Sequence, residues 1–285
     1  MGLAPFETEL ETQLAAELGA ELEAAPDVAS RAAAYDALSA VIDPELDEPI
    51  TDLGFVRSLD VAGDAVTVHL RLPTSFCAPN FAYLMASDAK DALAALPWTG
   101  DVLVELDDHH DSDLINAGLA ADAGYRGTFR HEADQDLDEL RATFQRKAHT
   151  AAMERCLTAL LRAEPGRAVE ELGAVTLGDL PADDRTAALL RRRAALGLAN
   201  APTAFVLVDH DGVGYAAGDV PLALRLARST RISIDGNAHF CRGLLRTRYP
   251  GSEAAQSARP DGAEPADARR DPTFIPLTQL KEHRS

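Results

Sequence analysis

Three side chains that can bind a metal or attack an electrophile follow predicted strands. Cys77 lies in "PTSFCAPN", between a strand-like and a helix-like run, and His109 and His110 lie in "DDHHDSD" after another strand-like run. The helix dipole stabilises the thiolate form of a cysteine that lies just ahead of a helix. The thiolate is the form that reacts and binds metal. Imidazole and thiolate together suit iron or zinc. These residues predict a thiol or metal site.

The same residues also fit a plainer interpretation. A lone cysteine in a globular protein commonly packs as a small apolar residue. Carboxylates and histidines after a strand are typical of a solvated loop, and no pair of ligands here has the tight spacing of a CxxC or HExxH motif. From residue types alone, both interpretations of Cys77 therefore stay open.

The elements expected around Cys77 have the order α-β-β-α-β. Helical spacing predicts a helix over residues 30–42, and alternation of apolar and polar residues predicts a hairpin of strands 54–61 and 65–72. A helix over residues 80–96 and a strand over 101–106 should follow. A right-handed crossover through that helix makes the last two strands parallel.

This topology gathers three loops at one edge of the sheet. They are residues 43–54 before the first strand, 73–79 after the second and 107–113 after the third. Cys77 should therefore lie close to His109 or His110. Asp43, Glu45 and Asp52 are candidates for groups that support such a site, or for ordinary turn caps.

A second region follows, and it is predicted to be helix-rich with some β structure. We expect a long amphipathic helix over residues 136–163, a hairpin over 203–218 with an Asp211-Gly212 turn, and a strand over 231–235 between two further helices. The last of these helices should be capped by Asn237.

The predicted fold class is α+β: a small α-β-β-α-β domain followed by a mixed α/β, helix-rich region. We divide the chain into an acidic helical arm (residues 1–28), the small domain (29–126), the helix-rich domain (127–250) and a disordered tail (251–285).

Charge and composition exclude several classes of protein. The formal net charge is −19, whereas a nucleic-acid-binding protein needs a basic patch to neutralise phosphates. No apolar run is long enough to span a bilayer, the acidic start lacks a signal-peptide pattern, and three scattered cysteines do not suggest a disulfide framework. We expect a cytoplasmic protein that binds neither nucleic acid nor membrane.

The stretch "VIDPELDEPITDLGFVRSLDVAGDAVTVHLRLPTSFCAPN" resembles the PaaD/SufT-like, MIP18-type family of iron–sulfur cluster assembly domains. The resemblance covers roughly residues 30–107. It departs from the family pattern in that Ala78 separates the cysteine from the next proline. The residues that carry it are Asp43, Pro44, Glu45, Ile50, Asp52, Leu53, Gly54, Val56, Thr74 and Cys77.

The resemblance implies a maturation factor that holds or hands on iron or an iron–sulfur cluster transiently, with Cys77 as the reactive or cluster-binding residue. His109 and His110 are candidates for further metal ligands from their residue type and the topology, and Asp43, Glu45, Asp52 and Thr74 of the family-like motif would support the site. "DHHDSDLINAG", "LRATFQRKAH" and "NAHFCRGLLRTRY" resemble accessory proteins of soluble diiron monooxygenases. Expected partners are a client iron enzyme such as a monooxygenase subunit, other iron–sulfur assembly proteins, or a second copy of the chain.

The other cysteines and histidines are weaker candidates. Cys241, with His239 two residues earlier, could relay or co-ligate metal, but packing in a core is the favoured interpretation. Cys156 should lie in a core. His131 and His149 should be surface or cap residues rather than ligands.

Three functions remain open. The leading one is a metal or iron–sulfur assembly factor, acting as a carrier rather than a catalyst. The alternative is a metal-free, chaperone-like scaffold for an oxygenase subunit. The third is a hydrolase or transferase with Cys77 as nucleophile and His109 or His110 as base. It ranks last, because no motif of an oxyanion loop or substrate pocket is present.

Overall fold

The structure, a computed structural model, describes residues 28–129 and 137–257. The chain divides into two compact units. The first runs to Ile42 and resumes over Pro49–Asp134, and the second combines Asp43–Glu48 with Gln135–Ser285. The domain boundaries drawn from the sequence remain a prediction.

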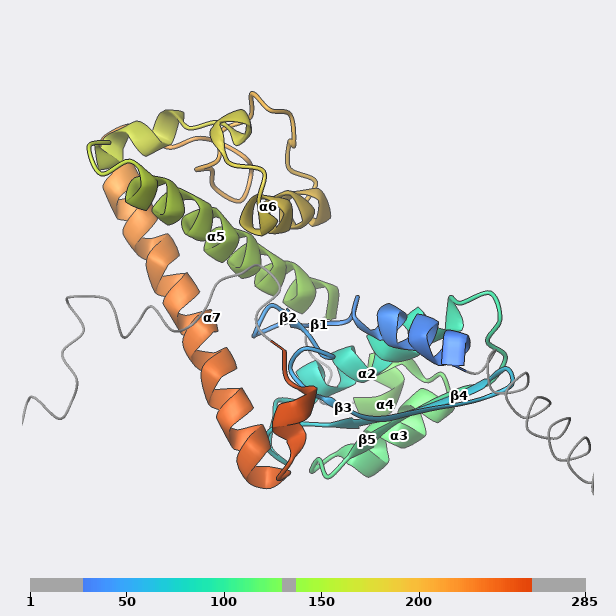
Figure 1. The fold of residues 1–285 in the computed structure, drawn as a ribbon. Helices are drawn as coiled ribbons and strands as arrows, with labels where there is room; N and C mark the ends of the chain where they lie inside the picture. The colour runs from blue at the N-terminus through green and yellow to red at the C-terminus, as the bar shows by residue number, and fades with distance from the viewer. Residues whose placement is uncertain (1–27, 130–136, 258–285) are drawn as a thin grey trace, which may run out of the picture. The chain divides into compact units, whose positions relative to one another are not determined.

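The first unit is built on a three-stranded sheet (Figure 1). Strand β3 pairs antiparallel with β4, and β4 pairs parallel with β5, so the predicted hairpin and crossover are confirmed. Gly63 closes the hairpin at a φ of 65°, a conformation that glycine adopts without steric cost. The elements in chain order are a helix over residues 28–38, β3 (Val56–Ala62), β4 (Ala65–Arg71), α2 (Pro79–Ala94), β5 (Val102–Asp107), α3 (Ser112–Ala120) and α4 (Gly124–Phe129).

The period-two pattern of β4 separates a buried from a half-exposed face. Val66, Val68 and Leu70 are buried, while the residues between them are partly exposed. Helices α2 and α3 both pack against β5. This core fixes the ends of β4 and β5, from which the Cys77 and His109 loops leave.

The second unit is mainly helical. Helix α5 packs against both α6 and α7 (Figure 1). The core of the second unit is formed by residues from these helices and from the segments between them. They include Met153, Cys156, Leu157, Leu172, Leu189, Val206, Leu207 and Val220. The elements are α5 (Leu137–Ala163), η2 (Val169–Ala174), η3 (Leu177–Asp179), α6 (Asp184–Ala195), α7 (Val220–Arg248) and η4 (Ser252–Ala255).

A buried network of charges joins α5 to α7. Glu154 on α5 is fully buried and pairs with Arg228 and Arg231 of α7. Next to it, Arg155 donates to Asp235 at 2.7 Å. Breaking a buried pair leaves a charge without compensation, so this network ties the two helices together.

The predicted hairpin over residues 203–218 is wrong. Val208 and Gly214 form an isolated bridge, and Thr176 bridges to Phe205, but the segment contains no strand. The Asp209 carboxylate accepts from the amides of Asp211 and Val213, which closes the loop locally. The run Val206–Val208 is buried at three consecutive positions, as expected for a core insertion and not for a two-faced strand.

The predicted strand over residues 231–235 is also wrong, because α7 continues through it and Asn237 lies inside the helix. Ile232 and Ile234 are two residues apart, as on one face of a β-strand, yet Ile232 is 55% exposed. The buried positions Ala227, Ile234, Ala238 and Leu245 instead have helical spacing.

The α+β class is confirmed, with a small mixed unit and a helix-rich one. In the part of the chain that the structure describes, no helix is both long and apolar enough to cross a bilayer. The predicted arm lies almost wholly outside the described residues. The predicted tail begins with an ordered segment that contains the short helix η4, and residues 258–285 lie outside the described residues.

Candidate functional site

Cys77 lies in the loop between β4 and α2, where the sequence places it. The residue is half-buried, and its sulfur is a free thiol. Helix α2 begins at Pro79, and its N-cap residue, Ala78, makes no side-chain capping hydrogen bond. The thiol therefore lies two residues ahead of a helix N-terminus that lacks a side-chain cap.

Thr74 supports the sulfur from within the same loop. Its Oγ1 lies 3.4 Å from Cys77 Sγ and accepts the amide of Phe76 at 3.2 Å. Either the hydroxyl or the thiol can be the donor of this contact, so Thr74 gives the sulfur a hydrogen-bond partner within its own loop.

His109 joins the Cys77 loop to the loop after β5. The Asp111 amide donates to His109 Nδ1 at 3.1 Å, so Nε2 carries the proton and donates to the Cys77 carbonyl oxygen at 2.8 Å. The side chain is only 5% exposed. The predicted proximity of His109 and Cys77 is confirmed, and the contact holds the Cys77 backbone rather than its sulfur.

His110 lies on the outside of the same loop. Its amide donates to the Ser75 carbonyl at 2.9 Å, while its exposed ring is 5.9 Å from the Phe76 ring, centroid to centroid. Phe76, next to Cys77, is itself 82% exposed. The edge therefore presents an apolar ring beside a thiol.

These residues do not form a complete ligand set within one chain. Among residues 28–129 and 137–257, no three His, Cys, Asp or Glu side chains are grouped so that they could hold a metal ion. Both ring nitrogens of His109 are engaged, and Asp107 pairs with Arg57 and His69. The assignment of Cys77, His109 and His110 as metal ligands stays a prediction.

The predicted supporting carboxylates divide between the two units. Asp43 is buried in the second unit, and its Oδ1 accepts the amides of Glu45 and Leu46 at 2.9 and 2.8 Å. Burial and, secondarily, the nearby Glu45 and Glu48 charges together raise the pKa of Asp43 to about 7. Asp43 thus stabilises the turn that it begins, over residues 43–46.

The neighbouring acids of this segment have partners within the same second unit. Glu45 accepts from Asn237 at 3.2 Å, Asp47 binds Arg192 at 2.7 Å, and Glu48 pairs with Arg242.

Asp52, in contrast, belongs to the first unit and is half-buried. Burial and, secondarily, the Asp52 charge raise the pKa of Tyr35. A role for these carboxylates at Cys77 remains a prediction.

The remaining candidates lie on α5 and α7. Cys241 is half-buried, His239 is exposed, and Phe240 between them is 66% exposed. Cys156 is buried in the core, as predicted. His149, predicted at the surface, is 1% exposed, because α5 carries it into the second unit. His131 lies outside the described residues.

Sequence reasoning missed two groups that hold this edge in place, the Asp111 amide and the Ser75 carbonyl, and it missed the exposure of the Phe76 ring. Both groups are backbone atoms, for which a sequence carries no signal.

Comparison with known proteins matches this region of the chain. The model of a family described as "Iron-sulfur cluster assembly protein" matches residues 31–106. An iron-sulfur cluster carrier protein of Mycobacterium leprae is 40% identical over 78 residues, which are 27% of this chain and 20% of that protein. Proteins of the same description from Mycobacterium bovis and Mycobacterium tuberculosis are 38% identical over 76 residues.

The sheet, apart from its last residue, and the Cys77 loop lie in the part of the chain, residues 31–106, that matches the iron–sulfur cluster assembly family. The family resemblance seen in the sequence is therefore confirmed. The chain spans about a fifth of the length of the curated relatives it matches. No solved structure matches the chain. The resemblance of its later segments to monooxygenase accessory proteins stays a prediction.

Proposed function

We propose that this protein is an assembly or carrier factor that binds iron or an iron–sulfur cluster transiently through Cys77. The observation that carries the proposal is the position of Cys77 in the family-matched region, with Thr74 Oγ1 3.4 Å from its sulfur. The relatives are described as cluster carriers. A half-buried thiol at a helix entrance can both hold and release a cargo.

The number of ligands supports transient binding. An iron–sulfur cluster is commonly held by four thiolates, and this edge supplies one. The missing ligands would come from a second copy of the chain, from an assembly partner or from the client. A site completed by a partner loses affinity when that partner leaves, which suits delivery better than storage.

The client in this proposal is an iron enzyme, for which the sequence favours a soluble diiron monooxygenase subunit. The protein would then act as a metallochaperone in the cytoplasm, and the cytoplasm keeps free thiols reduced. The exposed Phe76 ring beside Cys77 gives a client a surface to contact.

The same exposed ring also favours the second candidate, a metal-free scaffold that binds an oxygenase subunit at this edge. The two functions differ in whether Cys77 is needed. A scaffold would keep its client binding and activation when the sulfur is removed.

A transfer assay tests the proposal. The chain is loaded anaerobically with iron and sulfide, mixed with an apo-ferredoxin, and the acceptor's absorption and activity are followed. Wild type and the control variant Cys241→Ser should transfer clusters at equal rates, and Cys77→Ser should transfer almost none. Equal transfer by all three would contradict a role for Cys77. Stable loading without transfer would contradict the carrier function but not the site.

A further inference from the structure

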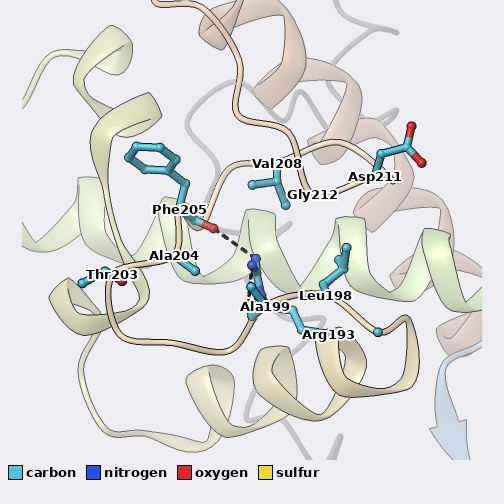
Figure 2. Close-up of a pocket in the computed structure, with 10 residues that line it drawn as sticks. Arg193, Leu198, Ala199, Thr203, Ala204, Phe205, Val208, Asp211 and Gly212 are labelled. Atoms are coloured by element: carbon cyan, nitrogen blue, oxygen red, sulfur yellow. Dashed lines mark hydrogen bonds between the residues drawn. The ribbon is translucent and has the colours of Figure 1, made fainter.

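The helix-rich unit contains a pocket of about 280 Å³ beside the C-terminal end of α6 (Figure 2). Its lining comes from Arg193 and from the segment that follows α6 in the chain, residues 197–212. Five of the lining side chains are apolar: Leu198, Ala199, Ala204, Phe205 and Val208. All of the residues that line the pocket belong to the second unit, whereas Cys77 belongs to the first.

Arg193 brings a buried positive charge to this pocket. The residue is 1% exposed, and no carboxylate of the described residues forms an ion pair with it. Its Nε and Nη2 donate to the Ala199 carbonyl at 2.9 and 2.7 Å, and Nη1 donates to the Phe205 carbonyl at 3.1 Å. Figure 2 shows the guanidinium between the backbone at Ala199 and the backbone at Phe205.

Carbonyl oxygens satisfy three of the five guanidinium N–H groups but carry no net charge to neutralise the cation. Buried charges in proteins are usually paired, since an unpaired one costs several kcal/mol. Burial accordingly lowers the pKa of Arg193, with no anion opposing it. The Asp211 carboxylate also lines the pocket, but Figure 2 shows it directed away from the guanidinium.

A second buried polar side chain lies close enough to Arg193 to be affected by its charge. His149 of α5 is 1% exposed, and its Nε2 has no hydrogen-bond partner among the described residues. Burial and, secondarily, the positive charges of Arg193, His210 and Arg192 together lower the pKa of His149 to about 4. His149 is therefore neutral near pH 7, and Arg193 is the buried cation for which the described residues supply no counterion.

We propose that this pocket binds a small organic monocarboxylate, with the carboxylate on the Arg193 guanidinium and a short apolar tail against Leu198, Phe205 and Val208. A carboxylate matches the two donors that Arg193 has left. A single negative charge balances the single buried cation, whereas the Asp211 carboxylate at the rim disfavours a dianion such as phosphate. The volume admits only a small ligand.

Calorimetric titration of the full-length protein with butyrate, butyramide and inorganic phosphate tests the charge requirement. Butyrate should bind saturably at one site per chain. Butyramide, which has the same shape without the charge, should bind at least roughly tenfold more weakly, because it loses charge-assisted hydrogen bonds. Equal binding of butyrate and butyramide, absence of saturable butyrate binding, or tighter binding of phosphate would overturn the proposal.

Three variants locate the site. Arg193→Met should abolish butyrate binding, and Arg191→Met, on an exposed position of the same helix, should bind as wild type does. Since Arg193 also holds two loop carbonyls, Thr203→Phe provides a second test: Thr203 is exposed, lines the pocket and is not one of the hydrogen-bond partners of Arg193, which are Ala199 and Phe205. The added ring should block the mouth and weaken butyrate binding at least roughly tenfold. Butyrate binding by Thr203→Phe at the wild-type affinity would overturn the proposal.

Discussion

The Cys77 edge and the Arg193 pocket place functional chemistry in opposite surroundings. At the edge, the thiol is half-buried and its neighbours are loop groups at the ends of two strands. In the pocket, the guanidinium is almost fully buried and its neighbours come from one helix and a long connecting segment. Exposure suits an exchangeable cargo, and burial suits a small ligand that is held away from water.

The two units also differ in what stabilises them. The first unit relies on an apolar sheet core with its charges at the surface, such as the pair of Arg57 and Asp107. The second unit buries charges between its helices, with Glu154 and Arg155 on α5. Substitution of a charge should therefore affect the helical unit far more than the Cys77 edge.

The largest expected effect is that of Glu154→Gln. It removes a buried charge that pairs with Arg228 and Arg231, so the free energy of unfolding of the helical unit should fall by about 3 kcal/mol. Urea unfolding measures the change, and the exposed Glu171→Gln serves as the control. The alkylation rate of Cys77 should not change. A faster rate would show that the thiol edge depends on the helical network.

The next effect concerns pH and the buried carboxyl of Asp43. Its pKa rises from 3.8 to about 7 on folding, so the stability that it contributes is fully present below pH 3.8 and is lost as pH rises through 7. Asp43→Asn keeps an oxygen acceptor for the turn but cannot ionise. At pH 8 it should therefore raise the free energy of unfolding by on the order of 2 kcal/mol, with a smaller difference at pH 5. A variant that is less stable at pH 8 than wild type would contradict the burial argument.

A smaller effect separates the two histidines of the edge. His109→Ala removes the hydrogen bonds to the Cys77 carbonyl and from the Asp111 amide, and should cost roughly 1–2 kcal/mol of stability. It should also speed alkylation of Cys77, because the loop loses its anchor. His110→Ala should change neither quantity, since its ring is exposed. If His109→Ala instead lowers metal loading with unchanged stability, His109 is a ligand and not a positioning residue.

The sequence carried enough information for the Cys77 edge but little for the pocket. Strand alternation and the right-handed crossover brought His109 beside Cys77, because both follow from local pattern and connectivity. The burial of His149 and Arg193 depends on how α5 and α6 pack, and no local pattern records it. Ile232 and Ile234 misled the assignment of α7, because two alternating positions fit either period.

The central claim is that Cys77 alone among the three cysteines binds the cargo, and the amount of cargo bound per chain tests it most directly. Each variant is reconstituted anaerobically with iron and sulfide, freed of unbound metal, and assayed for both elements and for the visible absorption of a cluster. Wild type and Cys241→Ser should load equally, and Cys77→Ser should lose nearly all bound iron and sulfide while unfolding at the wild-type temperature. A folded Cys77→Ser protein that loads as much cluster as wild type would contradict the account.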